Sequence, residues 1–135
     1  MVGLIWMVQI VHYPLMANVS GENYVQYQLL HERTITPVVG LPMIIEIVTA
    51  VMLLFYLPKG VSSVWVWTAL ILLIVVWLST AFLQVPCHSK LNAAFDADVH
   101  RRLVDTNWVR TIAWSLRGVL AVSYTHLTLP TICSV

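Results

Sequence analysis

The sequence predicts an all-α integral membrane protein: a bundle of four membrane-spanning helices with two interfacial amphipathic helices. Of its 135 residues, 59% are hydrophobic and only 10% are charged, whereas about 25% of a typical soluble domain is charged. Two stretches of 20 residues, 38–57 and 64–83, contain a single charged residue between them. The net charge of +1 gives no electrostatic footprint for nucleic acid. We therefore expect the lipid bilayer, and no nucleic acid, as a partner.

The segments 38–57 and 64–83 are the clearest spans. About 20 apolar residues, rising 1.5 Å each, cross the roughly 30 Å of hydrocarbon in a bilayer. Pro58 and Gly60 lie in the connection and favour a turn. These two segments are therefore expected to form an antiparallel helical hairpin.

Two further spans are expected at residues 2–19 and 107–122. With the linkers they make residues 1–122 a single four-span domain. The linkers 22–36 and 89–105 each place their apolar residues on one helical face, which is typical of helices lying at the bilayer surface. Thr36 followed by Pro37 predicts an N-cap with proline at the first helical position, so the second span should begin there.

Residues 123–135 are set apart as a non-native tail. Their sequence, SYTHLTLPTICSV, has no charged residue, and it resembles the translated read-through of a sequencing adapter. The alternative is a polar, frayed terminus. In either case we place no function on His126 or Cys133.

Counting spans places scattered polar residues on one side of the membrane. We call side A the side where the first span ends, so the second span begins there, the third ends there and the fourth begins there. His12, His31, His88 and Asn107 all fall at or near side A. Lys59 falls on the opposite side.

Helical spacing gives depth and facing. Glu46 lies nine residues past Pro37, roughly 13 Å into the bilayer, and Arg117 lies ten residues past Asn107, roughly 15 Å in. Gln9 and His12 are three residues apart and are expected to share a face. One stripe on the fourth span contains Asn107, Arg110, Trp114 and Arg117.

Charged side chains this deep should face the bundle, since each costs about 2.5–3.5 kcal/mol at the bilayer centre. One interpretation is a Glu46–Arg117 salt bridge that only fixes the packing of the helices. The other is a polar cavity open to side A and lined by Gln9, His12, Glu46, Arg110, Trp114 and Arg117. In that cavity His12 or Glu46 would move a proton and the two arginines would hold an anionic oxygen. Gln9, Asn107 and Trp114 would bind the ligand, with Trp114 stacked on its aromatic ring.

Four histidines are candidate ligands or catalytic groups. His12, His31 and His88 converge on side A and form an alternative metal site, for a transition metal or haem. His31 is equally well explained as an interfacial anchor, and His88 as a helix cap. His100 lies on a polar face and is expected to be solvated.

The C-terminal part carries a family resemblance. It contains VPCHSKLNAAFD and then LVDTNWVRTIAWSLRGVL, with Asn107-Trp108 followed by a Trp-x-x-Arg motif at Trp114 and Arg117. This pattern resembles the small four-helix membrane proteins of the anthrone oxygenase-like family, many of unknown function. The resemblance covers about the last third of residues 1–122. It implies oxygenation of a polycyclic aromatic substrate without a bound metal.

The sequence therefore predicts a multi-pass membrane protein, of a bacterial inner membrane, with an intramembrane pocket for a small aromatic or quinone-like molecule and redox or oxygenase chemistry. A small aromatic or anionic ligand and a homo- or hetero-oligomer are the expected partners besides lipid. The alternative is a non-catalytic membrane module, either a subunit of a larger complex or a minor transporter.

Overall fold

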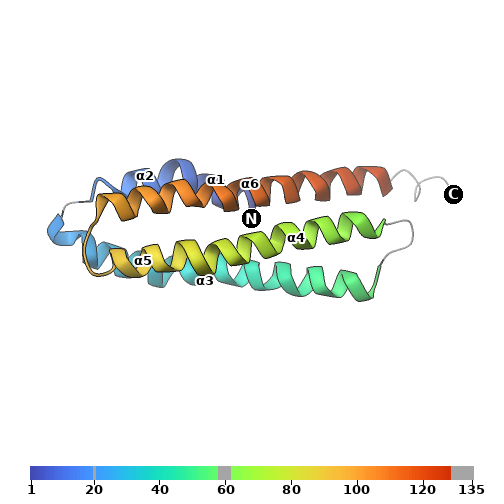
Figure 1. Ribbon diagram of the computed structural model, residues 1–135, viewed down its shortest axis with the longest axis horizontal. Coiled ribbons are helices and arrows are strands. Elements are labelled where there is room, and N and C mark those ends of the chain that lie inside the picture. The colour runs from blue at the N-terminus through green and yellow to red at the C-terminus, as the bar shows by residue number, and fades with distance from the viewer. Residues whose placement is uncertain (20, 58–61, 129–135) are drawn as a thin grey trace.

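The computed structural model describes residues 1–19, 21–57 and 62–128, with the side chains of all of these except 22 and 124–128. This part of the chain is all-helical and contains no strand. It forms four rods that lie side by side along one axis (Figure 1). The predicted turn at Pro58–Gly60, with Lys59, lies outside the described residues.

The first and third rods are each interrupted by a π-helix. The first comprises α1 (Val2–Met7), the π-helix η1 (Val8–His12) and α2 (Tyr13–Met16). The third comprises α4 (Ser63–Ser79), the π-helix η2 (Thr80–Gln84) and α5 (Val85–Leu91). The second rod is α3 (Gly21–Phe55) and the fourth is α6 (Ala97–Thr128).

Successive rods are antiparallel, so side A is the end at the left of Figure 1, where α2, α3, α5 and α6 meet. The N-terminus lies near the middle of the bundle (Figure 1). The first rod therefore runs beside α6 only from side A to about Gly118. Val2 packs close to Gly118, where a Cβ atom would stand 2.8 Å from the Cγ2 atom of Val2.

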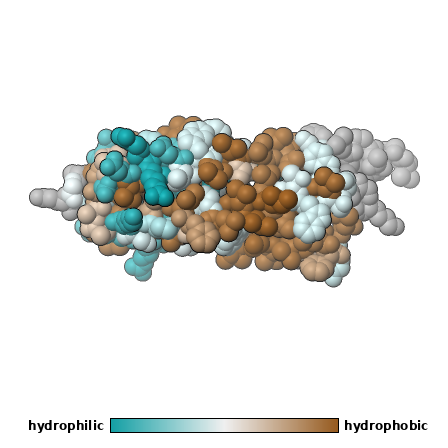
Figure 2. All heavy atoms as spheres, in the orientation of Figure 1, coloured by the Kyte–Doolittle hydropathy of each residue, from teal (hydrophilic) through white to brown (hydrophobic). Residues whose placement is uncertain are grey.

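Two helices, Asn23–Phe55 and Ser63–Leu91, are long and apolar enough to cross a membrane. Val2–Met16 is apolar but shorter. Polar residues gather at the side A end of the face in Figure 2, and apolar residues cover most of its remaining described length. The predicted hairpin of residues 38–57 and 64–83 matches the second and third rods.

The prediction of two separate interfacial helices is wrong. Residues 22–36 continue without a break into α3, and Pro37 lies inside that helix. Thr36 is not an N-cap, because its hydroxyl donates to the Glu32 carbonyl oxygen one turn back at 2.6 Å. Pro37 has no N–H, so the Arg33 carbonyl oxygen four residues earlier has no helical donor. Arg33 and Pro37 are both exposed, so this carbonyl faces the surroundings of the bundle.

The second linker is also divided between rods. Residues 89–91 finish α5, and α6 begins at Ala97. Asp96 caps α6, since its carboxylate accepts the backbone N–H groups of Asp98 and Val99 at 2.9 and 3.1 Å. The predicted span 107–122 is thus the middle of one 32-residue helix. That helix runs to Thr128, into the segment interpreted as a non-native tail. Residues 129–135, with Cys133, and the side chain of His126 lie outside the described part of the chain.

Candidate functional site

Two π-helices shape the side A half of the bundle. In η1 the Tyr13 N–H donates to the carbonyl oxygen of Val8, and in η2 the Val85 N–H donates to that of Thr80. Both bonds reach five residues back, whereas an α-helix reaches four. Each π-helix is followed by a proline, Pro14 or Pro86, which has no N–H to continue the α-helical pattern. π-helical turns of this kind occur frequently at functional sites.

Three histidines converge here, as the span counting predicted. His12 Nε2 lies 3.1 Å from His31 Nδ1, and the two rings are 4.3 Å apart between centroids. The His31 and His88 rings are 6.1 Å apart. Among the described residues, no group of three or more His, Cys, Asp or Glu side chains is arranged to hold a metal ion. The metal or haem alternative through these histidines stays a prediction.

His88 begins a directed hydrogen-bond network. The Gln28 amide donates to His88 Nδ1 at 3.0 Å, so in the neutral ring Nε2 carries the hydrogen. His88 Nε2 lies 3.3 Å from the Tyr13 hydroxyl, which in turn donates to Gln84 Oε1 at 3.4 Å. The Gln84 amide then donates to the Thr106 hydroxyl at 3.0 Å. Side chains of all four rods are thus joined through one imidazole.

A cavity of about 190 Å³ lies beside this network. Its polar lining comes from every rod, and its apolar lining comes from α3 and the residues around the two π-helices. The polar residues are Tyr13, His31, Glu32, Thr36, Thr80, Gln84, His88 and Arg110, and the apolar ones include Val8, Val39, Met43 and Val85. This combination suits a ligand with an apolar body and a polar head.

Arg110 is the exceptional group in this lining. It is only 6% exposed, and its Nε atom is buried without a hydrogen-bond partner. No described residue offers its guanidinium an acceptor or a carboxylate within ion-pair distance. Its Cζ atom lies over the Trp114 ring, 5.4 Å from the ring centroid, and the Tyr13 side chain is near enough to interact with it electrostatically. A buried charge is normally paired, so this cation lacks an anionic or carbonyl oxygen that a ligand could supply.

Of the six residues predicted to line a cavity, Arg110 is the one that lines this cavity. His12 does not line it but contacts two residues that do, His31 and Tyr13. Gln9 faces α6 instead, although it was expected to share a face with His12. The cause is η1, because a π-helix has more residues in each turn than an α-helix and so turns residues three apart to different neighbours.

Gln9 joins the first rod to α6. It donates to the Val104 carbonyl oxygen at 3.1 Å and accepts from the Asn107 amide at 2.8 Å and the Thr111 hydroxyl at 3.4 Å. All three polar side chains are buried. Gln9 and Asn107, predicted to bind the ligand, therefore bind each other.

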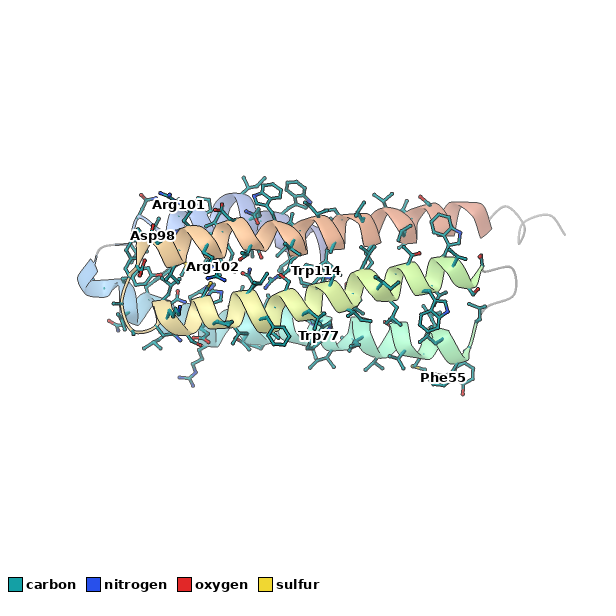
Figure 3. The ribbon with its side chains drawn as sticks, in the orientation of Figure 1. Phe55, Trp77, Asp98, Arg101, Arg102 and Trp114 are labelled. Atoms are coloured by element: carbon teal, nitrogen blue, oxygen red, sulfur yellow. The ribbon has the colours of Figure 1, made fainter. Side chains whose placement is uncertain are left out.

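Glu46 and Arg117 do not form the predicted salt bridge. The Trp114 indole N–H donates to Glu46 Oε2 at 2.9 Å, and Arg117 donates to the Ala69 carbonyl oxygen at 2.7 Å. Among the described residues no ion pair joins the two, although they are near enough to interact electrostatically. Trp114 points from α6 into the bundle (Figure 3). Its indole N–H bonds Glu46 and its ring face lies against Arg110, and Trp114 does not line the cavity.

The prediction for His100 is wrong. His100 is 7% exposed, and its Nε2 lies 2.9 Å from the Tyr13 carbonyl oxygen. A carbonyl only accepts, so Nε2 carries the hydrogen. This bond satisfies one of the carbonyls that the end of α2 leaves without a helical donor.

His100→Ala should therefore destabilise the bundle by about 1–3 kcal/mol, the cost of a buried acceptor left without its donor. The free energy of unfolding in detergent would measure this. His100→Gln keeps an amide donor and should lose less. An unchanged free energy of unfolding in His100→Ala would contradict this prediction and mean that the Tyr13 carbonyl oxygen accepts from another donor.

Sequence reasoning missed Tyr13, Gln28, Gln84 and Glu32. Two sequence signals point to the first three of these residues. Gln28 lies three residues before His31 and Gln84 lies four before His88, so each shares a helical face with a histidine. Tyr13 directly precedes Pro14, and Gln84 lies two residues before Pro86. Both residues therefore lie where a helix is distorted. Glu32 accepts a hydrogen bond from the Asn92 amide across the α3–α5 contact.

Comparison of the chain with protein-family models, curated proteins and solved structures finds no match. The resemblances to the anthrone oxygenase-like family and to adapter read-through stay predictions.

Proposed function

We propose that this chain is a four-span membrane protein that binds a small aromatic molecule with a phenolate or quinone oxygen, held at Arg110. The proposal depends on the buried Arg110 guanidinium, which lines a cavity and has no anionic partner among the described residues. A ligand oxygen would supply the missing acceptor. A charge-assisted hydrogen bond of this kind contributes about 1.5–3 kcal/mol.

Exposed apolar surface supports the membrane part of the proposal. Only 11% of the most apolar stretch of Asn23–Phe55 is buried, and only 22% of that of Ser63–Leu91. A core helix of a soluble protein would be mostly buried. Phe55 and Phe82 are 77% and 71% exposed, and Figure 3 shows Phe55 at the end of the bundle opposite side A. A bacterial inner membrane stays a prediction.

The cavity favours proton exchange at the ligand oxygen. His31 and His88 are the imidazoles in its lining, so they take the proton-transfer role expected of His12 and Glu46. His12 Nε2, 3.1 Å from His31 Nδ1, would adjust the hydrogen bonding of that ring. Oxygenation of a bound phenol is the reaction that the family resemblance implies.

Titration of the detergent-purified protein with 1,4-naphthoquinone, 1-naphthol and naphthalene tests the proposal, with empty micelles as the blank. The quinone and the naphthol should bind, and naphthalene should not. Arg110→Met should weaken binding about 10- to 100-fold. It should leave the melting temperature unchanged or raised, because replacing a buried, unpaired charge by an apolar side chain is often neutral or stabilising.

Arg101→Gln is the matched control, since this exposed cation lies on α6 outside the cavity. It should bind all three compounds like the unaltered protein. Equal binding of naphthalene, or full affinity in Arg110→Met, would contradict the proposal and favour the non-catalytic membrane module.

A further inference from the structure

A second cavity, separate from the one at Arg110, lies between α5 and α6 near side A. Its volume is about 350 Å³. Three charged side chains line it, Lys90 from α5 and Asp98 and Arg102 from α6. Its apolar lining includes Phe82, Leu83 and Pro86. In Figure 3 Arg102 lies on the side of α6 toward α5, and Arg101 lies on the other side. We call this cavity the α5–α6 groove.

The three charges of the α5–α6 groove are free to meet a ligand. Asp98 and Arg102 are four residues apart and share a face of α6, yet no described residue forms an ion pair with them or with Lys90. All three side chains are exposed. Two cations and one carboxylate therefore surround one opening.

The groove also extends along the membrane normal. Phe82 lies eight residues before Lys90, roughly 12 Å deeper along the third rod. Phe82 is 71% exposed, so its ring faces the surroundings of the bundle. The charged end at side A and the apolar end below it match the two ends of a phospholipid, a headgroup and an acyl chain. Basic pockets between membrane helices bind lipid headgroups in this way.

We propose that the α5–α6 groove binds phosphatidylethanolamine. The phosphate would accept hydrogen bonds from Lys90 and Arg102, and the ammonium group would donate to Asp98. An acyl chain would run along Phe82 and Leu83. The carboxylate gives selectivity: phosphatidylglycerol has no cation for Asp98, and the quaternary ammonium of phosphatidylcholine has no N–H to donate. This inference rests on the membrane part of the proposed function.

Native mass spectrometry of the protein with equal amounts of phosphatidylethanolamine, phosphatidylglycerol and phosphatidylcholine tests it. Phosphatidylethanolamine should be retained most. The double variant Lys90→Gln/Arg102→Gln should retain about tenfold less of it. Asp98→Asn should remove the preference for phosphatidylethanolamine over phosphatidylglycerol while both still bind. Arg101→Gln, with the same loss of charge one residue away and outside the groove, should change nothing.

Equal retention of the three lipids, or an unaltered preference in Asp98→Asn, would overturn the proposal. Soluble phosphoethanolamine carries the same phosphate and ammonium without acyl chains. If it displaced the lipid at equal concentration, the site would be one for a free metabolite and the lipid assignment would be wrong. Flotation of the protein with liposomes distinguishes failure of the proposed membrane function from failure of the lipid site. A protein that does not float contradicts the proposed membrane function. A protein that floats but shows no lipid preference contradicts the lipid site alone.

Discussion

Trp114→Ala is expected to destabilise the bundle by about 3–5 kcal/mol, the usual cost of removing a buried tryptophan. Trp114 is 1% exposed and is the largest of the fully buried side chains. Its loss leaves a void at the middle of α6, removes the indole donor from Glu46 and removes the ring beneath Arg110. Far-UV circular dichroism during titration of detergent-purified protein with sodium dodecyl sulfate would measure the unfolding free energy.

Two further variants make this prediction specific. Trp114→Phe keeps an aromatic ring but not the N–H, so it should lose only about 1.5–3 kcal/mol, the range for a hydrogen bond to a charged group. Trp108→Ala is the control, because Trp108 is 41% exposed and contacts Trp6 edge-on at 5.6 Å. It should cost no more than about 1.5 kcal/mol, the upper range for an aromatic pair. Equal losses in Trp114→Ala and Trp108→Ala would show that the Trp114 site is not a packed core.

The sequence could predict which end of the bundle holds the polar residues. Span counting needs only the number of helices and their direction, so it correctly brought His12, His31 and His88 together. The face of α6 that points into the bundle was also predictable. A charged Arg110 side chain facing lipid would be costly, so this face should point into the bundle interior. Asn107, Arg110 and Trp114 are all buried there.

Helix boundaries and partners were less predictable. An amphipathic stretch has the same periodicity whether it is a separate surface helix or the polar end of a longer rod, so residues 22–36 were placed wrongly. Pro37 favours a helix start, but it is also tolerated inside a helix where the freed carbonyl is exposed. The partner of Glu46 could not be found from depth, because both Trp114 and Arg117 lie at that level and only packing selects between them.

The cavity itself depended on a feature that α-helical spacing cannot represent. The π-helices η1 and η2 change which residues face the interior, directing Gln9 to α6 and bringing Tyr13, Gln84 and His88 around one space. Pro14 and Pro86 each lie two residues after a π-helix, but Pro37 lies inside α3 without one, so a proline alone does not predict such a turn. This explains why the interior face of α6 was predicted well and that of the first rod was not.

Gln9→Leu is expected to destabilise the bundle by about 2–4 kcal/mol. The substitution leaves the buried Asn107 amide without its acceptor. It also removes one of the two acceptors of the Thr111 hydroxyl, which keeps only the Asn107 carbonyl oxygen. It also removes the side-chain donor to the Val104 carbonyl. Each buried polar group without a partner costs about 1–3 kcal/mol. Unfolding in sodium dodecyl sulfate would measure the loss, and Gln26→Leu, at an exposed glutamine of α3, is the matched control.

The double variant Gln9→Leu/Asn107→Leu should recover part of that loss, because it removes both partners and leaves two apolar side chains facing each other between η1 and α6. Direct contact predicts a coupling free energy of about 0.5–3 kcal/mol in this cycle. A Gln9→Leu loss no larger than that of Gln26→Leu, or strictly additive losses at positions 9 and 107, would contradict the contact. Since Asn107 Oδ1 is already buried without a partner, Asn107→Leu alone should cost less than Gln9→Leu. That order of effects would identify Gln9, at the π-helix, as the residue that locks the first rod against α6.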